Sequence, residues 1–283
     1  SYQYNGAEYI LNGQGLHPNF WRAPIDNDYG AGLARKLGVW KEASYQDIMA
    51  ASFNARNGEV TCTYQFPQTD ATWDITYKIY TNGVIKVDNR FVAANEKTPM
   101  IPRIGLRMQM PETFTTLTYY GRGPEENYRD RRTSQFFGEY STPIKKMYEP
   151  YIRPQENNHR TDIYWCALTN KSGAGLLLVA DRTFEMNASN YPLETLDSGD
   201  DLHNAAPRTA QTNHRHLTDP KPEKMVDLFI DYRMMGVGGD NSWGALAHEP
   251  YLIRTGAQNA VEYGFTLVPF GRKTDFRNLI YQY

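Results

Sequence analysis

Hydrophobic and polar residues alternate with a period of two along much of this chain. Trp73, Ile75, Tyr77 and Ile79 share one side of such a stretch, and polar residues separate them. This alternation is typical of a β-strand with one buried face, because successive side chains of a strand point to opposite sides. The same pattern recurs in four further stretches, 84–93, 103–110, 226–232 and 261–267.

Turn signals join these stretches into hairpins. Asn82-Gly83 separates two alternating stretches, and both residues tolerate a positive φ, which favours a tight turn between antiparallel strands. Residues 169–173 predict a second hairpin turn. In the stretch 103–110, Arg103 and Arg107 fall on the polar side of the alternation.

Helical signals are few. We expect one short helix over about 31–41, with a glycine before it and another within it. Residues 130–161 and 186–222 are predicted to be long irregular loops, which in a compact domain tend to be functional or to form interfaces. No strand–helix repeat is present, which excludes a doubly wound sheet and a βα barrel. The prediction is therefore an all-β fold, a large antiparallel sandwich that forms one domain over residues 1–283.

Composition adds an abundance of aromatic residues, with 21 Tyr, 12 Phe and 5 Trp. Aromatic residues favour strands and fill cores, but their flat rings also stack on the apolar faces of sugars, so both interpretations stay open. The net charge is −2 without a basic block, which argues against nucleic-acid binding. No apolar run reaches the roughly 20 residues of a membrane-spanning helix. Cys62 and Cys166 leave one disulfide open.

Polar, glycine and aromatic residues gather in four segments, 20–30, 120–131, 151–158 and 236–243. Three glutamates in them, Glu125, Glu126 and Glu156, are the natural candidates for acid–base chemistry. A retaining glycosidase needs two carboxyl groups about 5 Å apart, whereas adjacent residues of an extended segment face opposite sides. Ion pairing with the nearby arginines, which would lock a loop, is therefore the favoured interpretation.

Two pairs of residues resemble metal ligands but lack the rest of a site. Asp26 and Asp28 could bind calcium in a loop, yet the further acidic positions of an EF-hand are missing. His214 and His216 have no evident third ligand. We expect these side chains to bond to local backbone, and we expect no metal in this chain.

Trp243 follows a run of Gly, Asp, Asn and Ser that cannot form a regular strand or helix. The glycines permit sharp turns and the polar side chains can lock them through backbone hydrogen bonds. The loop could therefore hold the indole outward, where it would bind the apolar face of a sugar. The alternative is that Trp243 closes one end of the core.

Taken in order, these segments resemble the small-chain domain of bacterial β-galactosidases of glycoside hydrolase family two. The motifs that carry the resemblance are Trp21-Arg22-Ala23-Pro24-Ile25-Asp26-Asn27-Asp28 with Gly30, Gly121-Arg122-Gly123-Pro124-Glu125-Glu126-Asn127-Tyr128 with Asp130-Arg131, Tyr148-Glu149-Pro150-Tyr151 with Pro154, Glu156 and Asn157, His214-Arg215-His216-Leu217, and Gly236 through Trp243. The resemblance implies a galactose-mutarotase-like β supersandwich, slightly clipped at its N-terminus. It also implies an enzyme that hydrolyses terminal β-galactosides with retention.

In that family the catalytic glutamates and the Mg²⁺ ligands lie on other domains, so the resemblance implies no catalytic residue and no cofactor in this chain. It implies that Trp243 contacts the aglycone side of a substrate such as lactose, and that Asp28 and Gly30 belong to a loop at the mouth of the site. The implied partner is a catalytic βα-barrel domain or large subunit, in a homo-oligomeric enzyme. The compartment, cytoplasm or periplasm, stays open.

Two other functions remain as alternatives. A mutarotase-like sugar epimerase would need an acid–base pair, for which His159 and Glu156 are the nearest candidates in sequence. A stand-alone carbohydrate-binding module would use Trp243 and the tyrosine-rich loops as its platform.

Overall fold

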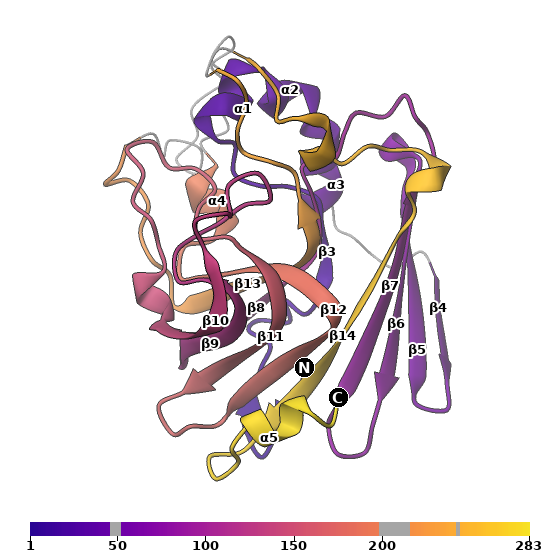
Figure 1. Ribbon diagram of the computed structural model, residues 1–283. Helices are drawn as coiled ribbons and strands as arrows, with labels where there is room; N and C mark the ends of the chain where they lie inside the picture. The colour runs from indigo at the N-terminus through magenta and orange to yellow at the C-terminus, as the bar shows by residue number, and fades with distance from the viewer. Residues whose placement is uncertain (46–51, 198–215, 242–243) are drawn as a thin grey trace.

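The chain folds around one large, curled antiparallel β-sheet (Figure 1). The computed structural model describes residues 1–45, 52–197, 216–241 and 244–283. Nine strands follow one another in the order β10-β9-β11-β12-β14-β7-β6-β5-β4. Strand β13 pairs with β12 and β8, and β3 pairs with β8, which completes the 12-stranded sheet. The all-β, antiparallel architecture predicted from the alternation is confirmed.

The strands are β1 (Gln3–Tyr4), β2 (Ala7–Glu8), β3 (His17–Asn19), β4 (Ser52–Arg56), β5 (Glu59–Phe66), β6 (Ala71–Ile79), β7 (Ile85–Ala93), β8 (Arg103–Pro111), β9 (Phe114–Gly123), β10 (Phe136–Pro143), β11 (Arg160–Asn170), β12 (Gly175–Ser189), β13 (Met225–Met234) and β14 (Val261–Phe270). The helices are α1 (Asp26–Gly30), α2 (Leu33–Lys36), α3 (Gly38–Tyr45), α4 (Leu193–Leu196) and α5 (Arg277–Ile280). Short 3-10 turns lie at Pro67–Thr69, Ile144–Lys146, Glu249–Tyr251 and Ala257–Asn259.

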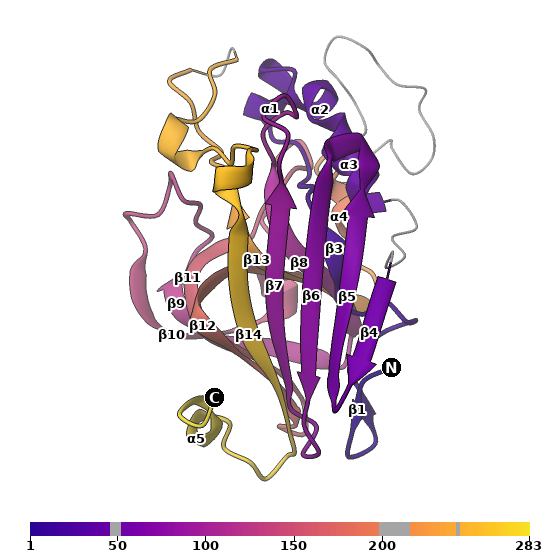
Figure 2. The same cartoon turned by 90° about the vertical axis from the view of Figure 1, so that its right-hand side faces the viewer.

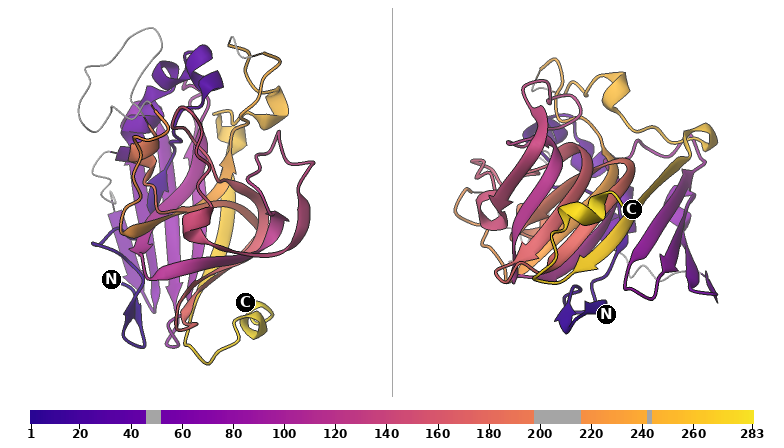
Figure 3. Two further views of the ribbon diagram at one scale, coloured as in Figure 1. Left: turned by 90° about the vertical axis from the view of Figure 1, so that its left-hand side faces the viewer. Right: turned by 60° about the horizontal axis from the view of Figure 1, so that its bottom comes forward.

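Strand β12 is the point at which the sheet divides. Its first half, from Gly175 to Ala180, pairs with β14, and its last residues, from Glu185 to Ser189, pair with β13. The long strand therefore belongs to two groups of strands that diverge, β14 with β7, β6, β5 and β4 on one side and β13 with β8 on the other. Figures 2 and 3 show the resulting shape, in which the first group stands upright and the second wraps across it.

Aromatic residues fill the space where these groups meet. Phe20 lies between Trp40 of α3 and Trp73 of β6, with ring centroids 5.1 and 5.4 Å away. Phe91 of β7 closes the cluster at 5.3 Å from Phe20, and all four side chains are buried. Burial of so much apolar surface is the dominant stabilising contribution in a sheet of this size. Most of the aromatic residues nearby are therefore core residues.

The two predicted hairpin turns are confirmed. Strands β6 and β7 pair in register from Ile79 with Ile85, and Gly83 in the turn has a φ of +86°. A residue other than glycine would be strained at that φ. Strands β11 and β12 form the second hairpin around Gly173, whose φ is +83°.

The predicted helix over 31–41 is wrong in extent. Helical structure begins earlier, at Asp26, and runs to Tyr45 in the three pieces α1 to α3. The breaks follow the glycines, since Gly32 before α2 has a φ of +66° and Gly38 starts α3. The start at Asp26 is accompanied by bonds of Asp28 to Arg22 and to the N–H of Ile25, described below.

Both predicted long loops contain regular structure. Residues 130–161 include the edge strand β10, and the first residues of 186–222 are the end of β12, followed by α4. Much of β10 is exposed, and none of its residues is buried. Residues 184–189 at the end of β12 do alternate in sequence, as Phe-Glu-Met-Asn-Ala-Ser, and all six are buried. Among the described residues, no helix is long and apolar enough to span a membrane, and Cys62 and Cys166 are both free thiols.

Candidate functional site

Four motif segments that are far apart in the sequence meet at the end of the molecule where α1 lies. They line a surface pocket of about 170 Å³. Its wall includes Asp26 and Asn27 of α1, Arg131, Tyr151 and Val237. A complete small-molecule site usually measures about 300 Å³ or more. The pocket is therefore smaller than a complete small-molecule site.

Arg22 anchors α1 against the end of β13. Its guanidinium is buried and donates to both carboxylate oxygens of Asp28, over 3.0 and 2.8 Å. It also donates to the carbonyl oxygens of Met235, over 2.7 Å, and Gly236, over 3.1 Å. Asp28 in turn accepts a hydrogen bond from the backbone N–H of Ile25, which caps the helix. A fixed charged pair with all its partners satisfied holds this junction rigid.

The segment 26–30, expected to belong to a loop, is a helix anchored to the rest of the fold. Asp28 is buried and Gly30 half-buried, and both lie in helix α1 and not in a loop. The prediction that Asp26, Asn27 and Asp28 bond to local backbone is only partly right. Asp28 binds Arg22 as well as the backbone of Ile25, and Asn27 donates to the carbonyl of Val237 over 3.1 Å. A role of Asp28 and Gly30 at the mouth of a site stays a prediction.

Asp130 holds the loop that follows β13. Its two carboxylate oxygens accept hydrogen bonds from the backbone N–H groups of Val237, over 3.1 Å, and Gly238, over 2.7 Å. A Cβ on Gly236 would lie 2.6 Å from an oxygen of Asp130, so only glycine permits this approach. The N–H of Gly236 donates to the carbonyl of Tyr251 over 2.8 Å. The backbone of 236–238 is therefore fixed from both sides.

Glu126 is bonded to several neighbouring groups and is not a free carboxylate. One oxygen accepts from Arg131 over 2.6 Å and from the hydroxyl of Tyr151, and the other accepts from the backbone N–H of Asn158 over 2.6 Å. The neighbouring Glu125 is exposed. The structure thus bears out the interpretation that ion pairing locks this loop.

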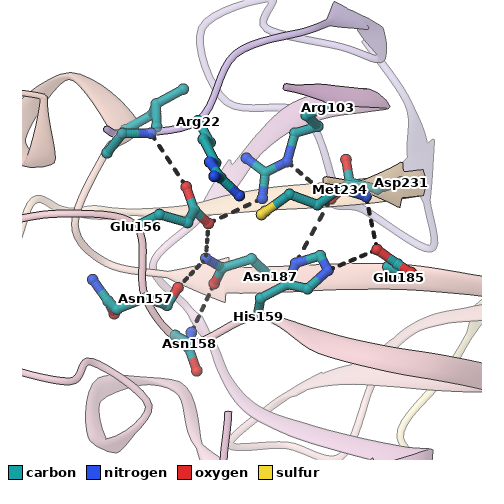
Figure 4. A network of polar contacts seen from close by, with 12 residues as sticks. Arg22, Arg103, Glu156, Asn157, Asn158, His159, Glu185, Asn187, Asp231 and Met234 are labelled. Atoms are coloured by element: carbon teal, nitrogen blue, oxygen red, sulfur yellow. Dashed lines mark hydrogen bonds and ion pairs between the residues drawn. The ribbon is translucent and has the colours of Figure 1, made fainter. Parts of the chain in front are cut away.

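Behind the pocket lies a buried network of charges (Figure 4). Glu156 accepts from Arg103 over 3.0 Å and from the backbone N–H of Ala23 over 3.3 Å. The Nε of Arg103 lies 3.1 Å from a carboxylate oxygen of Asp231. Arg103, Glu156 and Asp231 are 0, 3 and 0% exposed, respectively. The network therefore joins β8 and β13 to the first and third motif segments.

His159 extends the network to the second half of β12. Its Nε2 lies 3.0 Å from Glu185, which also accepts from the backbone N–H of Met234 and from Arg129. Burial would raise the pKa of Glu185, but the hydrogen bond and charge of His159, together with Arg129, lower it below its ordinary value. Burial raises the pKa of Asp231 well above its ordinary value, although Arg103 opposes the shift. The pKa values of these two neighbouring carboxyl groups are thus shifted in opposite directions.

The acid–base pair considered for an epimerase, His159 and Glu156, does not form. The hydrogen bond of His159 is to Glu185, and both His159 and Glu156 are buried with fixed partners. A general acid–base pair must reach a substrate. His159 and Glu156 therefore each have a structural role.

Some predicted site residues lie outside the described residues. Trp243 and His214 are among them. His216 is described, and its ring lies 3.3 Å from Asp219 on the surface. In the ranges that the structure describes, no group of three or more His, Cys, Asp or Glu is placed to hold a metal ion.

Sequence reasoning missed Arg103 and Asp231, since the alternation placed Arg103 and Arg107 on a polar face. Both arginines are buried. A signal was present, because Asp227 and Asp231 repeat the same four-residue spacing in the strand that pairs with β8. Arg107 binds Asp227 over 2.7 Å and Arg103 lies against Asp231. Opposite charges at the same four-residue spacing on two strands were therefore a signal that these strands pair.

Comparison with known proteins places these features in a family. Residues 1–267 match the family described as beta galactosidase small chain. A beta-galactosidase of Priestia megaterium is 33% identical over 272 residues, which cover 95% of this chain and 24% of that protein. A beta-galactosidase of Streptococcus thermophilus is 30% identical over 262 residues, which cover 89% of this chain and 23% of that protein. Among solved structures, a GalM/aldose epimerase homologue from C. elegans aligns with a TM-score of 0.42 and 9% identity, over 77% of this chain and 67% of that chain.

The chain spans about a quarter of the length of these curated relatives. The match to the family extends over nearly the whole chain and includes the motif segments that meet at the pocket. The chain belongs to the beta-galactosidase small-chain family, as a small-chain domain of β-galactosidases.

Proposed function

We propose that this chain is the non-catalytic, C-terminal module of a retaining β-galactosidase. In this proposal it lends Trp243 as an aromatic wall to the aglycone side of β-galactosides such as lactose. The partner is the catalytic βα-barrel domain, or a large subunit, of the same homo-oligomeric enzyme. That partner supplies the bond-breaking carboxylates and holds the Mg²⁺ of the family.

The anchoring of the loop 236–241 is the observation that supports this proposal most. Asp130 binds the loop backbone at Val237 and Gly238, and Arg22 binds the carbonyl of Gly236. On the far side of Trp243, the N–H of Ala245 donates to Asn241 over 3.4 Å. A ring borne between two anchored segments can orient a substrate, and fixed orientation lowers the barrier of a reaction that others carry out.

The glutamates of the motifs support the assignment of catalysis to another domain. A retaining glycosidase needs a nucleophile and an acid–base group about 5 Å apart, both open to the substrate. Glu126 already accepts bonds from Arg131, Tyr151 and Asn158, and Glu156 is buried against Arg103. These carboxylates are committed to structural bonds.

The proposal is tested by complementation. The Priestia megaterium enzyme is prepared without its matching region and mixed with, or fused to, this chain. We expect hydrolysis of lactose to return. Trp243→Ala should raise the KM for lactose about tenfold, which corresponds to about 1.4 kcal/mol of lost binding, while hydrolysis of a galactoside with a small aglycone changes less. Trp243→Phe should restore part of the affinity.

Phe136→Ala is the matched control, because Phe136 is an aromatic residue that is 73% exposed and does not line the pocket. It should leave the KM unchanged. Hydrolysis by the purified chain alone would contradict the proposal. Tight binding of lactose by the chain alone, measured by calorimetric titration, would favour a stand-alone carbohydrate-binding module.

A further inference from the structure

A second, larger cleft lies on the inner side of the curled sheet, at the place where β12 divides it. Its volume is about 1060 Å³, and it shares no lining residue with the pocket near α1. Strands β6, β7 and β14 form one wall, and the middle of β12, the end of β13 and the segment 129–132 form the other. Figure 1 shows these two groups of strands facing each other across the fold.

The second wall is built from β-bulges in two neighbouring strands, β12 and β13. Between Ile163 and Trp165, β11 advances two residues while β12 advances five, from Phe184 back to Val179. The extra residues of β12 are exposed and line the cleft. Strand β13 also has a bulge relative to β8, between Asp231 and Arg233. Bulges redirect side chains and are common next to functional sites.

These bulges present arginines that nothing in the described structure neutralises. Arg182 on β12 and Arg233 on β13 line the cleft, and neither has a hydrogen-bond or ion-pair partner among the described residues. The guanidinium of Arg233 lies over the ring of Tyr232, 5.4 Å from its centroid. Its Nε is buried without an acceptor. A buried donor without an acceptor is destabilising, so an oxygen of a ligand would be bound favourably there.

Two further arginines in the same wall share their counter-ions. Arg129 pairs with Glu185, which is also bonded to His159, and Arg132 pairs with Asp162, which also binds Arg122. Asp162, which is shared by two guanidinium groups, therefore offsets only part of the positive charge near it.

The lining of the cleft is balanced in number, with five arginines and five carboxylates. Of the carboxylates on the opposite wall, Asp88 lies 3.2 Å from Lys86 and Glu262 lies 3.6 Å from Arg90, while Asp74 accepts a hydrogen bond from Thr63. The charges are unevenly placed, because the two guanidinium groups without a partner lie together on the wall formed by β12 and β13.

We propose that this cleft binds a small organic anion, of the size of a sugar acid or a sugar phosphate, through Arg182 and Arg233. A guanidinium binds a carboxylate or phosphate with two parallel hydrogen bonds, and both anions fit the geometry. The cleft far exceeds the volume of an inorganic ion and is as large as the sites that hold whole organic ligands. The rings of Tyr232 and Tyr263, with centroids 5.9 Å apart, supply a partly apolar surface for the rest of the ligand.

Calorimetric titration of the purified chain tests this directly. Three probes share one sugar: galacturonate, galactose 6-phosphate and neutral galactose. We expect at least one of the two anions to bind and galactose not to bind. Binding of galacturonate alone assigns the ligand as a carboxylate, binding of galactose 6-phosphate alone assigns it as a phosphate, and binding of both supports a general oxyanion site.

The double variant Arg182→Gln/Arg233→Gln should lose at least tenfold in affinity for the bound anion. Arg272→Gln removes the same kind of charge from an exposed position outside the cleft and should change the affinity less than twofold. The proposal is overturned if neither anion binds, if galactose binds equally well, or if the double variant binds as the wild type does. Should the double variant unfold, Arg182→Gln alone, at an exposed position, replaces it under the same criteria.

Discussion

Arg103 connects three parts of the fold that are distant in sequence. Its guanidinium lies between Glu156 and Asp231, at 3.0 and 3.1 Å, and over the ring of Phe229 at 4.5 Å. Transfer of the Arg103 and Glu156 charges from water to the interior is costly, and these charges are tolerated because they are paired. Loss of one member of the network therefore leaves the others buried without a partner, which costs more than the pairing itself contributes.

Replacement of Arg103 by Met should therefore destabilise the chain by about 3–5 kcal/mol, because the buried carboxylate of Glu156 loses its cation. Urea unfolding followed by circular dichroism measures the difference. Arg277→Met is the matched control, since Arg277 and its partner Glu139 are 51 and 40% exposed. Such a surface pair contributes only about 0–1 kcal/mol. Equal losses in the two variants would show that the buried network is not special.

Asp231 predicts a dependence of stability on pH. Burial raises its pKa well above the ordinary value, so the folded protein keeps a proton that the unfolded chain releases. This contribution to stability is complete below the unfolded pKa of about 4 and is lost as the pH rises towards the folded pKa. Asp231→Asn removes the titration. Its stability relative to the wild type should thus improve as the pH rises from about 4 to about 8, by at most about 1.4 kcal/mol per pH unit.

Urea unfolding of both proteins across this pH range gives the test. Asp275→Asn, at an exposed position, controls for the general effect of one lost carboxylate. A difference between wild type and Asp231→Asn that stays constant with pH would mean that Asp231 is ionised in the folded chain throughout. Glu185 works in the opposite direction, because its lowered pKa gives stability that is lost only in acid.

Among the structural elements, the loop after β13 has two backbone N–H groups that share a single side-chain acceptor. Asp130→Ala removes the acceptor of two backbone N–H groups, those of Val237 and Gly238. Hydrogen exchange at these two amides should accelerate by at least tenfold. The amide of Met234 donates to Glu185 and should keep its protection, which gives an internal control. Unchanged exchange at Val237 and Gly238 would mean that other contacts, and not Asp130, keep the loop in place.

Strands in which hydrophobic and polar residues alternate could be predicted from the sequence. The stretches that form β6, β7, β8, β13 and β14 show this alternation, and both hairpin turns were predicted as well. In most of β8 and β13 the polar positions are buried too, so the alternation predicts the strand but not its burial. Strand β10 was not predicted, because none of its residues is buried. The end of β12 does alternate over 184–189, and this signal was overlooked.

The candidate site was predictable only in part. The motifs named the right segments, and the locking role of Glu126 follows from the charges around it. The start of α1 at Asp26 had a local signal, because Asp28 accepts from the N–H of Ile25 and binds Arg22, only six positions away. The bond from Arg22 to the carbonyl of Met235 spans 213 positions, and local patterns do not encode such a contact.

At the scale of the whole molecule, one core runs through both groups of strands. The main cluster of buried hydrophobic residues contains Tyr9 and Phe20 near one end of the sequence and Phe265 and Leu267 near the other. Strand β12 is shared by both groups, so neither can separate without breaking its pairing. We expect the chain to unfold as one cooperative unit, and the single domain over residues 1–283 stays a prediction.

Scanning calorimetry can decide this. One transition is expected, with equal calorimetric and van't Hoff enthalpies and a heat-capacity change of about 3.5–4 kcal/mol/K for a chain of this length. Arg103→Met should lower the midpoint of that single transition and not split it. Arg103 lies on β8, and its partners lie on β13 and in the segment before β11, so its loss weakens contacts between different parts of the same core. Two resolved transitions would mean that the strands from β4 to β7 form a domain of their own. In that case β12 would be the boundary between two units, and the large cleft would lie between them.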